Sequence, residues 1–92
     1  MDESDWPFGE GEGYCADVEL GEHRLRLFSA LSGHTAGWAG YVYDLEAKRW
    51  VGKPQWADGP EDGKQKAALF ASAIVKAELP PLTWRRSPQQ TR

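Results

Sequence analysis

From residue 14 the chain alternates between apolar and polar side chains with a period of two. Residues 14–20 are apolar at every second position, and residues 23–31 continue the pattern after a break at Gly21 and Glu22. Such alternation is typical of half-buried strands. A glycine at the first of two central turn residues fits a tight hairpin of type II′. The pattern therefore predicts two antiparallel strands joined by a two-residue turn.

A two-residue turn also predicts which residues of the hairpin face one another. The expected pairs are Val18–Leu25 and Ala16–Leu27 on the apolar side, and Glu19–Arg24 and Asp17–Arg26 on the polar side. Opposite charges across a pair contribute about 0.2–1 kcal/mol and help to fix the register. We interpret these charges as structural. A contact of Arg24 and Arg26 with a ligand or nucleic acid stays open as the alternative.

Two further strands are expected after a loop at residues 32–37. They cover residues 38–45 and 49–53. A four-residue turn between them would set Asp44 opposite Arg49, Tyr43 opposite Trp50 and Val42 opposite Val51. One face of the sheet would then hold the three rings of Tyr41, Tyr43 and Trp50. Residues 52–60 contain two prolines and are expected to lead the chain out of the sheet.

A helix is expected after these prolines. The apolar residues at helical spacing are Ala67, Phe70, Ala71, Ile74 and Ala77. Asp58 is the expected N-cap, with Pro60 in the first turn. Pro80 should end the helix near Glu78 or Leu79. The small alanines would let the helix lie close to the sheet, and Leu82 and Trp84 are expected to return over the core.

These elements predict an α+β fold: a four-stranded antiparallel meander (β-β-β-β-α) with one C-terminal helix packed on one face. The expected domain covers residues 14–84. Residues 1–13 are expected to be an acidic, glycine-rich flexible tail and residues 85–92 a flexible basic tail. Within the first tail, Trp6 and Phe8 could anchor the tail on the domain, act as a short linear motif or form a loosely packed flank.

Charge is unevenly distributed along the 92 residues, whose net charge is −3. Residues 1–22 hold eight of the 14 acidic side chains and none of the 11 basic ones. Such a chain can be self-complementary, or it can expose a basic body behind an acidic arm.

Composition argues against several locations and cofactors. The single cysteine excludes an internal disulfide, and no Cys/His spacing resembles a zinc site. No apolar run approaches the roughly 20 residues of a membrane helix, and the first residues lack the features of a signal peptide. We expect a cytoplasmic protein without cofactor, metal or membrane contact.

Catalysis has one candidate pair, Cys15 and His34. A reactive thiolate needs a nearby cation or helix N-terminus to lower its pKa, but Cys15 falls early in a strand, opposite Phe28. His34 fits a solvated histidine of the loop. The chain contains no nucleophile elbow, zinc-protease motif or phosphate-binding loop. We therefore expect that the protein is not an enzyme.

Nucleic-acid binding is the alternative function. Residues 38–56, followed by the alanine-rich helix, resemble the DNA-binding domains of the integrase arm-binding type, which combine a three-stranded sheet with one helix. The likeness rests on Trp38, the turn at Asp44, Trp50 and the helix. It implies a sheet that reads the major groove with several Arg and Lys side chains, but residues 38–45 contain neither. Aromatic rings could stack on bases, and the nearby cations Lys48, Arg49 and Lys53 could hold phosphates.

Protein binding is the function we expect. Interfaces favour Trp, Tyr and Arg near their centres, and the chain has five Trp and three Tyr. The partner would be another protein or a second copy, so a homodimer is possible. The candidate binding residues are Trp38, Tyr41, Tyr43, Trp50 and Trp56, with Arg24 and Arg26 as charges at the rim.

Overall fold

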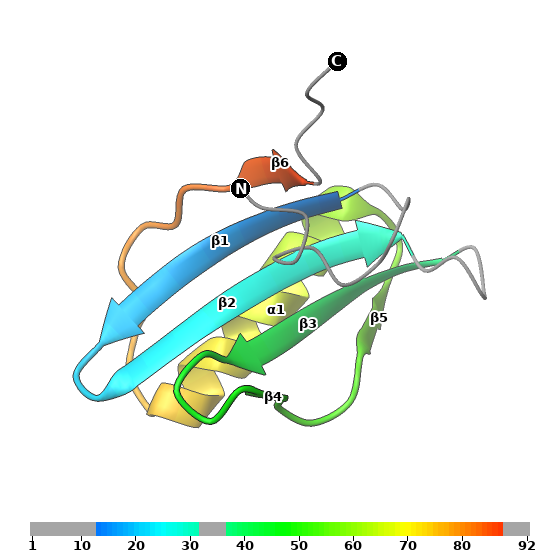
Figure 1. Cartoon of the computed structure of the whole chain (residues 1–92). Helices are drawn as coiled ribbons and strands as arrows, with labels where there is room; N and C mark the ends of the chain where they lie inside the picture. The colour runs from blue at the N-terminus through cyan, green and yellow to red at the C-terminus, as the bar shows by residue number, and fades with distance from the viewer. Residues whose placement is uncertain (1–12, 32–36, 88–92) are drawn as a thin grey trace, which may run out of the picture.

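The computed structural model describes residues 13–31 and 37–87, which form one antiparallel sheet and one helix (Figure 1). The strands are β1 (Gly13–Leu20), β2 (His23–Leu31), β3 (Trp38–Asp44), β4 (Arg49–Trp50), β5 (Gln55–Ala57) and β6 (Arg85–Ser87), and the helix is α1 (Pro60–Val75). The strand order is β4-β3-β2-β1-β6, and β5 also pairs with β3. The predicted α+β class, with a helix on one face of an antiparallel meander, is confirmed.

Several expectations lie outside the described residues. They are the interpretations of Trp6, Phe8 and His34, and those of residues 1–12 and 88–92.

The hairpin of β1 and β2 has the predicted register. Val18 pairs with Leu25, and Asp17 pairs with Arg26. Gly21 has a φ of +61°, which a glycine adopts without the steric cost of a Cβ. Because side chains alternate along a strand, this register sends Val18 and Leu25 toward one face and the charged pair toward the other.

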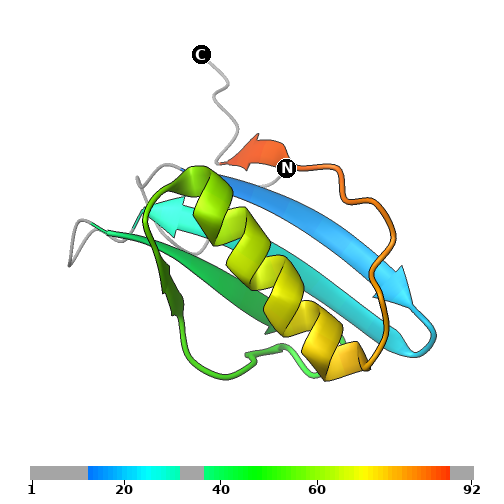
Figure 2. The ribbon, with the colours of Figure 1, turned by 180° about the vertical axis from the view of Figure 1, so that it is seen from behind.

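Helix α1 lies across one face of the sheet (Figure 2). The core between the two layers consists of Val18, Leu25, Leu27, Val42, Ala67 and Ala71, and Leu82 and Trp84 pack against it as predicted. The two layers approach closely at Gly40. A Cβ on this residue would lie 2.6 Å from the Gly63 carbonyl oxygen and 2.8 Å from the Ala67 nitrogen. The small residues of α1 thus allow backbone to pack against backbone.

Ser29 fixes the start of the helix to β2. Its side chain is fully buried, and its Oγ donates a hydrogen bond of 2.7 Å to the Pro60 carbonyl oxygen. A buried hydroxyl needs such a partner. The same bond holds the first residue of α1 at a defined place over the sheet.

Both predicted ends of the helix are wrong. The N-cap is Gly59, not Asp58, whose backbone N–H instead donates to the Asp62 carboxylate at 3.0 Å. The Asp62 carboxylate therefore lies in the first turn of α1, close to the positive end of the helix dipole, which stabilises its negative charge.

At the other end, α1 stops at Val75, before the Glu78 or Leu79 that Pro80 suggested. Lys76 is left-handed, and its N–H and that of Ala77 both reach the Ser72 carbonyl oxygen. Such bonds satisfy the last carbonyls of a helix. Ala77, expected in the buried stripe, is therefore exposed beyond the end of the helix.

The edge of the sheet beside β3 also differs from the prediction. The fourth strand ends at Trp50 instead of continuing to Lys53, because Gly52 has a φ of +68° and Pro54 has no N–H for the ladder. The chain leaves the sheet only over a few residues, because β5 pairs again with Trp38–Gly40 of β3. Val51 still donates the backbone hydrogen bond to the Val42 carbonyl oxygen (2.9 Å) that the predicted pairing implies. Residues 51–54 together form an outward loop opposite only two residues of β3, Tyr41 and Val42.

Strand β6 was not predicted. Residues 85–87, expected in the flexible basic tail, pair with residues 13–15 of β1. The sequence shows no alternation there, and three residues are too few to give a pattern. The strand forms because the chain, after Leu82 and Trp84 cover the core, runs along the free edge of β1.

The close contact at Gly40 yields a test of the packing. We expect Gly40→Ala to lower the free energy of unfolding by about 1–3 kcal/mol, because the new methyl group meets backbone atoms that cannot turn away. Urea denaturation measures the change. Gly59→Ser is the control, since a Cβ at Gly59 has open space and serine is a favoured N-cap. Equal stabilities of the two variants would contradict the proposed backbone contact.

Candidate functional site

The sheet face opposite α1 carries most of the candidate residues. We call it the aromatic face and define it by Phe28, Tyr41, Tyr43, Trp50 and Trp56. Strand pairing places Phe28 beside Tyr41, Tyr43 beside Trp50, and Trp56 beside Ala39. Paired residues point to the same side of a sheet, so all five rings belong to one surface. Figure 1 looks onto this surface, with α1 behind the sheet.

Trp50 is the centre of a ring cluster. Its ring centroid lies 5.5 Å from that of Phe28, 5.7 Å from Tyr41 and 5.1 Å from Tyr43, which it meets at 78°. Such tilted and edge-to-face contacts are the favourable arrangements of aromatic pairs. Trp50 nevertheless keeps 41% of its surface exposed, and Trp56 keeps 54%. Two large indole rings on this face are thus partly exposed to solvent.

The turn between β3 and β4 places Trp50 there. The Asp44 carboxylate accepts hydrogen bonds from the backbone N–H groups of Glu46 and Ala47, and Lys48 adopts a φ of +59°. An Asp that bonds to the backbone two residues later is a common way to hold a turn. The turn thereby sets Trp50 opposite Tyr43.

A second buried cluster lies on the same face of the sheet and shares Phe28 with the rings. Cys15 and Ala30 are fully buried and Phe28 is 2% exposed, with Tyr41 and Tyr43 packed against them. No helix or strand within residues 13–31 and 37–87 lies over this side of the sheet (Figures 1 and 2). The centre of the aromatic face therefore has the character of an interior surface.

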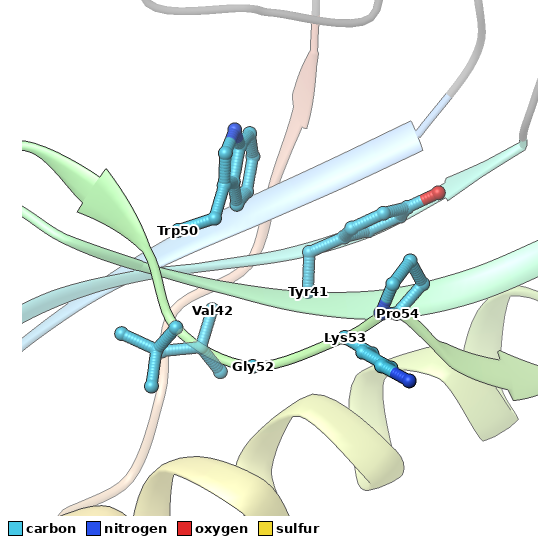
Figure 3. A pocket seen from close by; sticks show the side chains of 7 residues that line it. Tyr41, Val42, Trp50, Gly52, Lys53 and Pro54 are labelled. Atoms are coloured by element: carbon cyan, nitrogen blue, oxygen red, sulfur yellow. The ribbon is translucent and has the colours of Figure 1, made fainter.

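A cavity of about 380 Å³ adjoins the ring cluster. It is lined by Tyr41, Val42, Trp50, Val51, Gly52, Lys53 and Pro54. Figure 3 shows the side chains of Tyr41, Trp50 and Pro54 on one side of the chain and that of Lys53 on the other. Partial burial raises the pKa of Tyr41 above 10.0, so its hydroxyl keeps its proton at neutral pH. Its lining is largely apolar, so the cavity can hold an apolar group.

One end of the aromatic face is charged. Arg26 donates two hydrogen bonds to the Asp17 carboxylate, at 2.7 and 3.1 Å, and Arg85 lies 3.5 Å from the same group. Arg24 pairs with Glu46 at 3.0 Å and with Glu19 at 3.4 Å. The three arginines are thus neutralised by carboxylates, which makes this end a polar rim and not a basic patch.

These pairs affect the titration of Asp17. Partial burial acts to raise the pKa of Asp17, but the hydrogen bonds and positive charges of Arg26 and Arg85 outweigh it. The pKa of Asp17 is therefore held below its usual value of 3.8. The carboxylate remains charged at any pH at which the protein is expected to work.

Most, but not all, of the candidate binding residues lie on the aromatic face. Tyr41, Tyr43 and Trp50 lie together, and Arg24 and Arg26 stand at the end of the same face. Trp56 joins them only because β5 exists. Trp38 does not lie on this face. Alternation along β3 puts it on the side of Gly40 and Val42, which faces α1.

The sequence interpretation also missed two members of this site. Phe28 touches Trp50, and Pro54 lines the cavity. Phe28 could have been found, since the predicted pairing sets it two residues from Arg26 and hence on the same face. Pro54 could not, because its position depends on the outward loop.

The described residues offer little for other chemistry. Within residues 13–31 and 37–87, no three His, Cys, Asp or Glu side chains are grouped to hold a metal ion. Cys15 is buried, and its suggested partner His34 lies outside these ranges. No helix in this part of the chain is long and apolar enough to cross a membrane.

Comparison with known proteins gives no match: no family, no curated protein and no solved structure is similar to this chain. Function therefore has to be inferred from the aromatic face itself.

The lowered pKa of Asp17 predicts how stability depends on pH. Its charged form favours folding above the unfolded pKa of about 3.9, and this contribution is lost as the pH falls through the lower folded pKa. Asp17→Asn should therefore lower the free energy of unfolding at pH 7 by about 0.5–1 kcal/mol, an amount limited by solvent screening. The difference from the wild type should shrink below about pH 4.

Urea denaturation at a series of pH values measures this difference. Glu22→Gln, which removes an exposed carboxylate at the hairpin turn, is the matched control and should have little effect. A deficit of Asp17→Asn that stays constant down to the lowest pH would show that charge is not its cause.

Proposed function

We propose that this domain binds another protein through the aromatic face. The observation that carries the proposal is the pair of exposed indole rings, Trp50 and Trp56, on one surface beside a cavity lined by Tyr41 and Pro54. Tryptophan and tyrosine are enriched among the residues that dominate binding energy. Their rigid rings contribute a large contact area while losing little conformational freedom.

The surface also has the layout of a protein interface. Such interfaces have an apolar centre surrounded by a polar rim. Here the rings form the centre, and the pairs of Arg24 and Arg26 with carboxylates form the rim. A paired rim contributes orientation and specificity more than affinity. A second copy of the chain is one protein that could occupy this face, as expected from the sequence.

Nucleic acid is supported less well as the ligand. Arg24 and Arg26 already face carboxylates, and Lys53 points away from Tyr41 and Trp50 (Figure 3). Phosphate binding needs cations whose charge is available and should weaken as salt is added. We accordingly expect no binding to single- or double-stranded DNA or RNA, even at about 50 mM salt. Binding under these conditions would support the alternative.

The proposed module is not an enzyme. Cys15, the suggested nucleophile, is fully buried beside Phe28, where a substrate would not reach it. We place the protein in the cytoplasm on the ground that one cysteine cannot form an internal disulfide.

Trp56 provides the test. We expect Trp56→Ala to leave the domain folded, because the side chain is 54% exposed, and to weaken partner binding about 30-fold, as for an interface residue worth about 2 kcal/mol. Affinity capture from an extract of the source cells, with and without nuclease and followed by mass spectrometry, identifies the partner. Calorimetry with the purified partner measures the loss.

Leu69→Ala is the matched control, because Leu69 is 71% exposed on α1, away from the aromatic face. It should bind like the wild type. Trp50→Ala should also weaken binding, and circular dichroism must show that this variant is folded. A partner retained by Trp56→Ala, or lost equally with Leu69→Ala, would reject the aromatic face as the binding surface.

A further inference from the structure

The centre of the aromatic face is buried more deeply than a bare sheet surface. Cys15 and Ala30 have no exposed area, although neither α1 nor another described helix or strand covers them. An apolar sheet face is stable when a second layer shields it from water. The question is which part of the chain has the chemistry to provide that layer.

Residues 1–12 have that chemistry. Beyond the described ranges, the only aromatic side chains are Trp6 and Phe8, which flank Pro7. Residues 32–36 and 88–92 contain no large apolar side chain. The Trp-Pro-Phe sequence also suits the cavity beside Tyr41 and Trp50, since prolines and aromatic rings pack well in aromatic-lined grooves.

The segment is also long enough. It joins the sheet at Gly13, two residues before Cys15. Trp6 lies seven residues before Gly13, which an extended chain spans as about 23 Å. Strand β4 is three strand spacings from β1, or about 14 Å. Trp6 can therefore reach any ring between Phe28 and Trp50.

Local charge favours the same path. Residues 1–12 contain five acidic side chains and no basic one. The chain enters the sheet beside β6, where Tyr14 pairs with Arg86 and Cys15 with Arg85. Of these two cations, Arg85 shares the side of Cys15, which is the aromatic face, so Glu10 and Glu12 of a segment that crosses this face would pass the Arg85–Asp17 pair. Gly11 between the two glutamates lets the backbone turn back over the sheet.

We propose that residues 1–12 dock on the aromatic face of the same molecule, with Trp6 and Phe8 packed over Phe28 and against Tyr41 and Trp50. The tether raises the local concentration of the segment, which favours it over a second copy. The docked segment occupies the surface assigned above to a partner, so that a partner has to displace it. This last consequence, unlike the docking, rests on the proposed function.

Nuclear magnetic resonance of the full chain tests the docking. The wild type should show nuclear Overhauser contacts from the rings of Trp6 and Phe8 to those of Phe28, Tyr41 and Trp50. The double variant Trp6→Ala/Phe8→Ala should lose them and shift the indole signal of Trp50. Signals of Leu69, on the outer surface of α1, should not move.

Ser4→Ala, in the same segment, is the control and should leave the Trp50 signal in place. If the double variant fails to fold, the nuclear Overhauser contacts in the wild type still show whether the segment docks. Absence of these contacts in the wild type would overturn the proposal. So would contacts that appear only between differently labelled molecules, which would assign the docking to a second copy.

The regulatory consequence is measured separately, with the purified partner from the capture experiment. The double variant should bind that partner more tightly than the wild type, and Trp56→Ala should bind it less tightly. Docking contacts without any partner lost in Trp56→Ala would reject the proposed function and leave the docking intact. A partner that binds the wild type and the double variant equally well would reject the competition.

Discussion

The pairing of β1 with β2 is the constraint on which the rest of the structure depends. Because side chains alternate along each strand, one register decides both what meets α1 and what forms the aromatic face. A slip of one residue would turn Arg26 toward the helix, where a guanidinium without a carboxylate costs several kcal/mol. The Asp17–Arg26 pair and the apolar pair of Val18 with Leu25 therefore support the same register from opposite sides of the sheet.

Strand β2 carries this register to the far side of the sheet. It pairs with β3 over seven residues, so that Phe28 lies beside Tyr41 and Leu27 beside Val42. The two faces then follow different packing rules. On the helix side, Gly40 and the small residues of α1 bring the backbones together. The larger rings are directed to the other side, where no described helix limits their size. Close packing on one face thus accompanies a bulky, ring-rich surface on the other.

Much of this arrangement could be predicted from the sequence, because alternation and opposite charges determine strand pairing. The hairpin register, the pairing of Tyr43 with Trp50 and the helix with its buried Ala67 and Ala71 all follow from such local patterns. Strands β5 and β6 do not. Each has three residues, and each forms because an earlier strand leaves an unpaired edge, which no local pattern records.

The candidate site was predictable to the same extent. The ring cluster follows from the register, whereas the cavity follows from residues 51–54, whose path depends on Gly52 and Pro54. Trp38 is a candidate binding residue that the alternation along β3 places on the side of α1, away from the other rings. Composition alone, a surplus of aromatic residues, suggested it. A ring belongs to a surface only when its strand position puts it there.

The outward loop at residues 51–54 has a consequence for how the molecule avoids polymerising. A long, straight outer strand would present a row of free backbone groups to which another chain could add, as in fibrils. Here that border is divided into strands of two and three residues, with a left-handed glycine and a proline between them. A neighbour finds no continuous ladder to extend, so this border resists amyloid-like growth even though the adjacent surface is rich in aromatic rings.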